Sequence, residues 1–485
     1  MLRRYREDRG YAVVMTALVL VPLMGFAGFA VDVGAWYARA SELQRAADAA
    51  SLAGVVWQPD FTEAENAARA EAARNGFIHG VDGIEVNVTD TGNNQLEVQI
   101  IDTDADTFFA GLFLDDVAIG RQAVSEYVES VPLGSPESRF GTGTETWTGF
   151  SATNFNAALS GYCTSKDMGD QIMVAYEWIG WGGCTTPDPL WDTNEDYDAN
   201  GYWYAIEKAD GMNEDILVNI FDVGTCEAVA TDIDDIGGSS PAGAFNTVWT
   251  LHEADNTPIN DFDNPVYATF TSVEGGSCGT WDTIFTIPGA GRTGRWYLNV
   301  RTNAADAAIG HNLYGIWAQR ASDTTPCSTL SDSSCPQMFA IERMGVLVDQ
   351  PGVATGDFFL AEIDDVHAGK QMKVSLWDTA DGMDYLQILD PNGSPVSFTF
   401  ETSDGVYSGS NDTCSGQPCL DVDPGGSAIY NGRLLELVID LPTAATFAGY
   451  PDNWWNIFYQ ASGSNVWDRT TWGVEILGDP VRLLE

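Results

Sequence analysis

One acidic stretch has the spacing of a calcium-binding loop. Asp196, Asp198 and Asn200 alternate along the chain, Gly201 follows, and Glu207 comes last, in the order D-x-D-x-N-G-x5-E. Oxygen ligands at alternate positions can surround a hard cation, and a final glutamate can bind it bidentately. The flanks are not helical, so the alternative is an acidic turn that leads into an aromatic strand. If calcium binds, we expect the first three residues to hold it with partners from elsewhere in the chain.

A second short motif has the form G-x-S-x-G, which in hydrolases positions a nucleophilic serine. It runs from Gly275 to Gly279 and would place Ser277 as the nucleophile. That chemistry needs a strand, a sharp turn and a helix, whereas the following TWDTIFTIPG is strand-like. The sequence shows no other nucleophile–base pair, metal triad or phosphate loop. We therefore predict that the protein is not an enzyme.

The cysteines are confined to the part of the chain that follows an apolar N-terminal segment. Their number is even, which predicts disulfides formed in an oxidising compartment. Eight cysteines allow 105 pairings, so the sequence leaves the connectivity open. Our working hypothesis is sequential pairing: Cys163–Cys184, Cys226–Cys278, Cys327–Cys335 and Cys414–Cys419.

Aromatic side chains offer a further kind of site. The chain has 16 tryptophans, which either fill cores or form stacking platforms for sugars. Trp454 and Trp455 are adjacent, so on a strand they face opposite sides and we expect one to be exposed. A surface glycan is the ligand that such a platform would bind.

All of these candidate residues follow an apolar segment near the N-terminus, which is predicted to be a helix. Residues 11–31 carry no charge, which is enough to cross a hydrocarbon layer of about 30 Å. Helical periodicity continues beyond Asp32, which we expect at the level of the lipid headgroups. The basic tail, residues 1–10, contains four arginines, so the positive-inside rule places the N-terminus in the cytoplasm and the rest outside. We predict one helix over 11–57 that crosses the lipid bilayer and then continues outside it.

Small residues on this helix would let neighbouring helices approach closely. The alternative is that the external half packs against the protein's own next domain. The residues predicted to pack or assemble in this way are Gly25, Gly28, Trp36, Leu43, Ala47 and Ala50.

The N-terminal segment resembles the TadE/TadG-like proteins of Flp (Tad) pilus assembly. The resemblance is carried by AVVMTALVLVPLMGFAG, then AVDVGAWY, then LQRAADAASLAG, and extends over about residues 9–130. It implies a membrane-anchored component of a pilus or type II-like secretion machine, with pilin-like or secretion-platform proteins as partners. Met15 and Thr16 stand where processed members carry a glutamate, which favours the uncleaved TadG-like type.

The charge balance excludes one class of partner. Seventy acidic residues against 22 basic ones give a net charge of −48, which repels the phosphate backbone, so we expect no nucleic acid partner. Such a surface suits solubility outside the cell. Its alternative meaning is divalent cation binding, and calcium is the one cofactor that the sequence suggests.

Beyond the helix the chain changes character twice. Residues 58–130 combine a helical segment with alternating strands, which predicts a small α+β cap. Residues 131–150 are rich in Gly, Ser, Thr and Pro and are predicted to be a linker. Short aromatic and β-branched strands then recur between turn residues, with a weak internal repeat. We predict two tandem antiparallel β-sandwiches of jelly-roll type, residues 151–330 and 335–485.

These inferences combine into one function and one alternative. The predicted protein spans the membrane once, has its bulk at the cell surface or in the periplasm, and serves as a non-catalytic structural or assembly component of a Flp/Tad pilus system. The alternative is a surface adhesin that binds glycan or protein through calcium-stiffened sandwiches.

Overall fold

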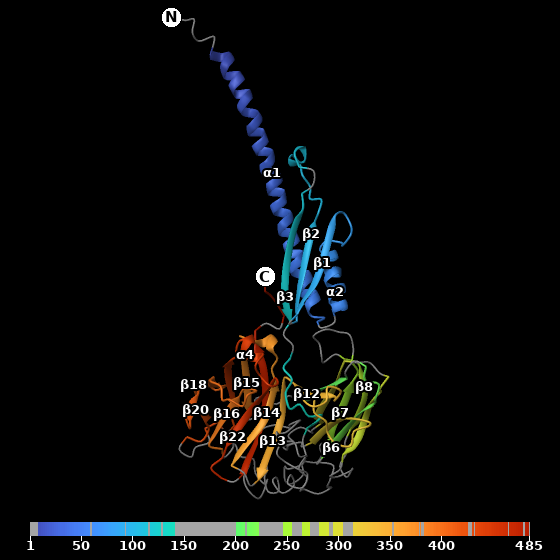
Figure 1. Ribbon diagram of the computed structural model, residues 1–485, viewed down its shortest axis with the longest axis vertical. Coiled ribbons are helices and arrows are strands. Elements are labelled where there is room, and N and C mark those ends of the chain that lie inside the picture. Colours follow the sequence, from blue (N-terminus) through green and yellow to red (C-terminus); the bar gives the residue numbers. More distant parts are fainter. Residues whose placement is uncertain are drawn as a thin grey trace. The chain divides into compact units, whose positions relative to one another are not determined.

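The computed structural model consists of a long N-terminal helix, a small helix-and-sheet domain and several antiparallel sheets (Figure 1). It describes residues 8–58, 61–92, 94–114, 117–127, 130–140, 200–208, 211–222, 246–254, 264–271, 281–290, 294–303, 314–351, 354–377, 379, 383–424, 429–430, 432–463, 465–478 and 481–484. The chain divides into two compact units, Met1–Glu129 with Gly478–Glu485, and Ser130–Leu477. The predicted order of a long helix, a small α+β cap and antiparallel sheets is confirmed.

The first unit is built on α1 (Asp8–Val55), an unbroken helix of 48 residues. Its large apolar side chains from Tyr11 to Val33 are exposed, with exposed fractions from 42% for Met15 to 76% for Phe26. By length and composition this helix can cross a membrane. Further along, Leu43, Ala46, Ala47 and Ala50 are almost completely buried. One helix therefore has an exposed apolar half and a half that forms the core of a domain.

That core lies between α1, α2 (Phe61–Arg74) and one face of a four-stranded antiparallel sheet in the order β1-β2-β3-β24. The strands are β1 (Ile84–Gly92), β2 (Gln95–Asp102), β3 (Ile119–Tyr127) and β24 (Val481–Leu483). Every second residue of β2 is buried, as expected for a strand with one covered face. Alanines at positions 64, 68 and 72 form the buried stripe of α2. Small side chains on both helices let them pack closely on each other.

The last strand of the chain belongs to this first unit. β24 pairs with β3 in antiparallel register, with Val481 opposite Tyr127 and Leu483 opposite Ser125. We had predicted residues 335–485 as one sandwich, so the assignment of the final residues was wrong. Three residues are too few for a sequence pattern to identify their partner. The whole second unit is thus inserted between two neighbouring strands of the first.

The second unit begins with a β-sandwich. One sheet has the order β12-β5-β10-β7-β8 and the other β4-β11-β6-β9. Its strands are β4 (Arg139–Phe140), β5 (Tyr202–Lys208), β6 (Ile216–Asp222), β7 (Asn246–His252), β8 (Val266–Thr271), β9 (Asp282–Ile287), β10 (Gly294–Asn303), β11 (Tyr314–Arg320) and β12 (Gln337–Ile341). Aromatic residues such as Tyr204 and Trp249 fill the space between the sheets. Because β12 pairs with β5, the first sandwich extends past the predicted boundary at residue 330.

A second sandwich follows, with sheets in the order β13-β23-β15-β21-β17-β18 and β14-β22-β16-β20-β19. Its strands are β13 (Arg343–Pro351), β14 (Thr355–Glu362), β15 (Gln371–Trp377), β16 (Tyr385–Leu389), β17 (Thr399–Thr402), β18 (Ser408–Ser410), β19 (Asp412–Cys414), β20 (Gln417–Asp421), β21 (Leu434–Asp440), β22 (Trp454–Gln460) and β23 (Asn465–Leu477). Most of the buried hydrophobic residues of the two sandwiches form one continuous cluster, and Ala205, Tyr297, Phe339 and Ile341 form a separate one.

A short extended segment joins the two sandwiches into one sheet. Leu133 forms antiparallel bridges to Ala340 of β12 and to Ala361 of β14. The Leu133 amide donates to the Ala340 carbonyl at 3.1 Å, and the Ala340 amide donates back at 2.9 Å. We had predicted residues 131–150 as a linker. Their described part, 131–140, is instead built into sheets, because buried Leu133 and Phe140 fix it there. The remainder of the predicted linker lies outside the described residues.

Candidate functional site

The distinctive site of the first unit is the carboxylate of Asp32, where the exposed half of α1 ends. This side chain is completely buried and accepts backbone hydrogen bonds from one loop. The Phe108 amide donates to Oδ1 at 2.6 Å, the Phe109 amide to Oδ2 at 2.9 Å, and the Ala110 amide to Oδ2 at 2.5 Å. Bonds to an ionised acceptor are stronger than neutral ones. Asp32 therefore fixes the loop between β2 and β3 against α1.

Two further contacts hold the same loop to the helix. Gly28 lies one turn before Asp32, and a Cβ there would come within 2.7 Å of the Phe109 ring. One turn after Asp32, the Trp36 indole Nε1 donates to the Asp106 carbonyl at 3.2 Å. The loop thus follows α1 over roughly two turns, or about 12 Å. From the sequence we had expected Asp32 only at the headgroup level. The FFAG run at 108–111 was the available signal for a docked loop.

An open pocket of about 610 Å³ lies beside this junction. Its lining includes Trp36, Arg39, Asp82, Asp104 and Asp106. The Arg39 guanidinium donates to the buried carboxylate of Asp102 at 2.7 Å and lies 4.8 Å from the centre of the Phe77 ring. Because Arg39 is already paired with Asp102, the other carboxylates of the lining leave the pocket wall with a net negative charge. Among the described residues no group of three metal-ligating side chains occurs.

The residues predicted for helix assembly separate into two groups. Leu43, Ala47 and Ala50 are completely buried under the protein's own sheet and α2, so they are not available to a neighbouring helix. For them the alternative of packing against the cap is correct. Gly28 is covered by Phe109, whereas Gly25 has no atom within 4 Å of a Cβ built on it. Gly25 therefore remains open, whereas Trp36 is half-buried and bonded to the Asp106 carbonyl.

The structure separates the candidate calcium ligands that it describes. Glu207 lies on β5, where its carboxylate is 3.6 Å from Arg295 Nε on the neighbouring strand. An extended chain from Tyr202 to Glu207 spans roughly 17 Å, which carries Glu207 away from Asn200. The aromatic strand that we had named as the alternative is thus present at Tyr202–Lys208, and calcium binding stays a prediction. Asp196 and Asp198 lie outside the described residues.

The described cysteines pair as predicted. Disulfides join Cys327 to Cys335 and Cys414 to Cys419. Cys163, Cys184, Cys226 and Cys278 lie outside the described residues, as does the G-x-S-x-G motif. Each observed bridge closes a short loop, with sequence separations of 8 and 5 residues. Each bridge therefore lowers the conformational entropy of the unfolded chain, by less than a bridge across a longer loop would.

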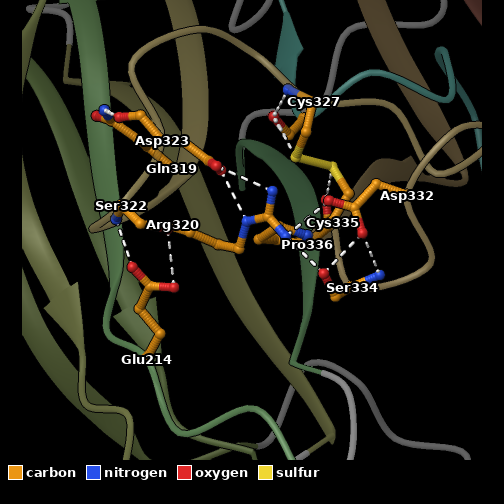
Figure 2. Close-up of polar contacts among 11 residues, drawn as sticks. Glu214, Gln319, Arg320, Ser322, Asp323, Cys327, Asp332, Ser334, Cys335 and Pro336 are labelled. Atoms are coloured by element: carbon orange, nitrogen blue, oxygen red, sulfur yellow. Dashed lines mark hydrogen bonds and ion pairs between the residues drawn. A yellow bond between two sulfur atoms is a disulfide. The ribbon is translucent and has the colours of Figure 1, made fainter.

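The first of these loops is held by Arg320 at the end of β11 (Figure 2). Its guanidinium makes a two-pronged contact with Asp323, with both N–O distances 2.9 Å, and reaches Asp332 inside the disulfide loop at 2.9 Å. Hydrogen bonds from Ser334 and the contact with Arg320 lower the pKa of Asp332 to about 2. Glu214 accepts hydrogen bonds from the amide and hydroxyl of Ser322 in the same cluster (Figure 2). The hydrogen bonds and ion pairs of this cluster fix the loop.

The adjacent tryptophans are not a sugar platform. Trp454 is 1% exposed and Trp455 is 0% exposed. Trp455 belongs to the continuous core cluster, and the Trp454 ring packs edge-on against Phe359, 5.7 Å between centroids. The expectation that one of the pair is exposed was wrong, because both faces of the sheet are covered at β22.

One carboxyl in the second unit has a strongly shifted pKa. Glu362 ends β14, and its Oε2 accepts a hydrogen bond from Gln337 Nε2 at 2.7 Å. Burial, with the nearby charge of Asp364, raises the pKa of Glu362 to about 7. The site holds no second acid or base at bonding distance in the described chain. Its effect is to couple stability to pH.

Together these features define a class of protein: one long N-terminal helix able to cross a membrane, a small cap built on the same helix, and a large β-sandwich unit inserted in the cap. Residues 10–74 match the family model described as Putative Flp pilus-assembly TadE/G-like. The matched range covers α1 from Gly10 and all of α2. The link to the pilus-assembly model is thus a similarity over residues 10–74.

The other comparisons add no such link. The comparison with curated proteins gives no match. Among solved structures, the VP2 subviral particle of infectious bursal disease virus is 9% identical, covering 73% of this chain and 83% of that chain with a TM-score of 0.10. The Gx strain of the same virus is 10% identical, with coverages of 73% and 82% and a TM-score of 0.09. Scores this low carry no argument about fold or function.

Proposed function

We propose that this protein is a membrane-anchored, extracytoplasmic assembly component of a Flp/Tad pilus or type II-like secretion system. The observation that carries the proposal is the family match at residues 10–74, because it coincides with α1 and α2. The exposed apolar half of α1 would cross the lipid bilayer. The arginines before it favour a cytoplasmic N-terminus, with both units outside.

The role that we propose is structural and non-catalytic. Pilin-like or secretion-platform proteins would contact the membrane half of α1, because the external half is occupied by the protein's own cap. Gly25 is open on that half and would admit a neighbouring helix. Gly25→Leu should then weaken co-purification with the platform proteins. Gly34→Leu is the control, because Gly34 is equally open but lies after Asp32.

The test of the whole proposal is a pilus count by electron microscopy in a strain that lacks the protein. The strain is complemented either with the full chain or with a chain in which Asn-Gly replaces residues 128–480. This replacement keeps β24, whose Val481 lies opposite Tyr127. Immunoblots of the membrane fraction control for expression. Loss of pili that both chains restore would support an assembly role for the first unit. Normal pili with reduced surface attachment would reject that role and favour the adhesin.

A further inference from the structure

We propose that the loop Thr107–Leu114 inserts into the lipid surface beside α1, so that the first unit contacts the membrane at two places. The proposal rests on α1 being the membrane anchor. The loop contains no charged residue. Its large apolar side chains are exposed: Phe108, Phe109, Leu112, Phe113 and Leu114 have exposed fractions of 66%, 50%, 79%, 88% and 45%. So much exposed apolar surface in one loop marks a contact site.

The height of the loop along α1 is fixed by contacts. Phe109 packs over Gly28, four residues before Asp32, and Asp32 itself holds the loop amides. Four helical residues span about 6 Å. If the membrane-spanning part of α1 ends at Asp32, the loop reaches about 6 Å into the membrane from that level. This depth matches the 5–10 Å to which interfacial apolar segments are buried at the boundary of headgroups and acyl chains.

Six backbone amides of the loop are hydrogen-bonded within the protein, as a medium poor in water requires. The amides of Phe108, Phe109 and Ala110 donate to Asp32. The Leu112 amide donates to the Phe109 carbonyl, and those of Phe113 and Leu114 donate to the Ala110 carbonyl, at 3.2, 2.8 and 2.9 Å. An amide without a partner is costly where water is scarce. The buried Asp32 carboxylate thus satisfies the Phe109 and Ala110 amides at the start of the 3-10 turn Ala110–Leu112, which have no acceptor within the turn.

Charges limit how deep the loop can go. Asp104 and Asp106 precede it, and the sequence continues with Asp115 and Asp116. Carboxylates are expensive inside a bilayer, so only the eight residues between them can enter the apolar layer. Trp36, bonded to the Asp106 carbonyl, lies at the height where indoles favour the interface. The carboxylates on both sides of the loop and the position of Trp36 therefore limit the loop to a shallow insertion.

Lipid is the occupant that fits this surface. The exposed side chains of the loop continue the exposed apolar surface of α1 at Phe29, Val31 and Val33. A surface that continues the membrane-spanning face of the helix meets the same medium. A second copy of the chain is the competing occupant, and both copies would carry a net charge of −48.

The test uses the full chain in phosphatidylcholine vesicles, with a spin label on a cysteine introduced at one position. Phe113→Cys probes the loop, Ile78→Cys is the matched control because Ile78 is exposed at 51% in the same unit, and Leu20→Cys probes the anchor. Relaxation by oxygen, which concentrates in lipid, is compared with relaxation by a water-soluble nickel chelate. The unmutated chain, treated identically, gives the background. Substitution at Phe113 removes little packing, because this side chain is 88% exposed.

We expect the oxygen-to-nickel accessibility ratio at position 113 to exceed that at position 78 several-fold and to approach that at position 20. A nickel-accessible label at 113 with a lipid-exposed label at 20 would overturn loop insertion and leave the anchor intact. Nickel access at both positions would overturn the anchor and the loop proposal together. Protection from both reagents at 113, with spin–spin broadening between labels, would show a second copy on the loop and overturn lipid as its occupant.

Discussion

At the scale of residues, Asp32 shows how one charge can serve the backbone instead of a ligand. A carboxylate at the end of an apolar span has to be hydrated, paired or hydrogen-bonded. Here three amides of a loop more than seventy residues away supply the hydrogen bonds. These bonds give the Asp32 carboxylate and the three loop amides hydrogen-bond partners at the same time. The side chain therefore couples the position of the loop to the helix.

Asp32→Asn tests this coupling. The amide keeps one acceptor oxygen and presents an NH2 group to the loop amides, so at least one hydrogen bond is lost. We expect hydrogen exchange at the Phe108, Phe109 and Ala110 amides to accelerate by roughly tenfold. Asp106→Asn is the control, because it removes the same charge from an exposed position in the same loop. Unchanged exchange in Asp32→Asn would contradict the role of this carboxylate.

Glu362 leads to a different prediction, because burial raises the pKa of this carboxyl. Its pKa is about 7 in the folded chain, against an ordinary value of 4.5. The folded state therefore holds the proton more tightly, and the free energy of unfolding should fall as the pH rises from about 4.5 to about 7. The loss is at most roughly 3 kcal/mol. Urea unfolding of the full chain in detergent, followed by tryptophan fluorescence across this range, measures it.

Glu362→Gln supplies the control for this pH dependence. Glutamine retains an oxygen that can accept the hydrogen bond from Gln337 and has no proton to lose. Its unfolding free energy should stay constant over the interval in which that of the unmutated chain declines. Parallel curves for the two chains would contradict the assignment.

At the scale of elements, α1 shows that one helix can serve two media. Its first half presents large apolar side chains outward, and its second half buries alanines against α2 and β2. Close approach of the two helices depends on Gly54. A Cβ at this position would lie 2.5 Å from Leu96 Cδ2 and 2.8 Å from the Ala64 carbonyl oxygen. Because that oxygen belongs to the backbone of α2, the clash cannot be relieved by a side-chain rotation.

Gly54→Ala should therefore destabilise the first unit by about 1–3 kcal/mol through overpacking. Gly34→Ala is the matched control on the same helix, since no atom lies within 4 Å of its Cβ and alanine favours a helix over glycine by about 1 kcal/mol. Hydrogen exchange of the α2 amides in micelles reports both effects. Equal changes in the two variants would mean that helix propensity, not packing, controls this crossing.

At the scale of the whole molecule, the second unit is an insertion. β3 ends at Tyr127 and β24 begins at Val481, and these residues face each other in the sheet. The chain between them builds two sandwiches that share one hydrophobic cluster through Leu133. Such an arrangement is tolerated where the ends of the insertion lie close together. The first unit should consequently fold without the second.

A chain with Asn-Gly in place of residues 128–480 tests this independence, because a two-residue turn joins directly paired antiparallel residues. We expect cooperative melting and retained protection of the β2 amides. Removing β24 as well is the control, and it should lower the stability by roughly 1 kcal/mol or more, since Val481 packs against the cap core. A molten or aggregated Asn-Gly chain would show that the first unit depends on the second.

Sequence patterns were sufficient where the signal is local. An uncharged run of 21 residues, alternating strands and turn clusters predicted the long helix, the cap and the antiparallel sheets. Two of the proposed disulfides, Cys327–Cys335 and Cys414–Cys419, were also correct, because short separations favour near partners. The match to the pilus-assembly family model lies in the same N-terminal segment.

Tertiary structure decided what depends on distant partners. The sequence could not show that Ala47 faces its own sheet, that Trp454 and Trp455 are both covered, or that Arg295 on the neighbouring strand is the partner of Glu207. It could not connect Asp32 to Phe108, or Tyr127 to Val481. Periodicity tells which side of an element is buried, but not which surface buries it. That choice follows from packing and hydrogen bonding between segments far apart in the chain, which only the folded molecule brings together.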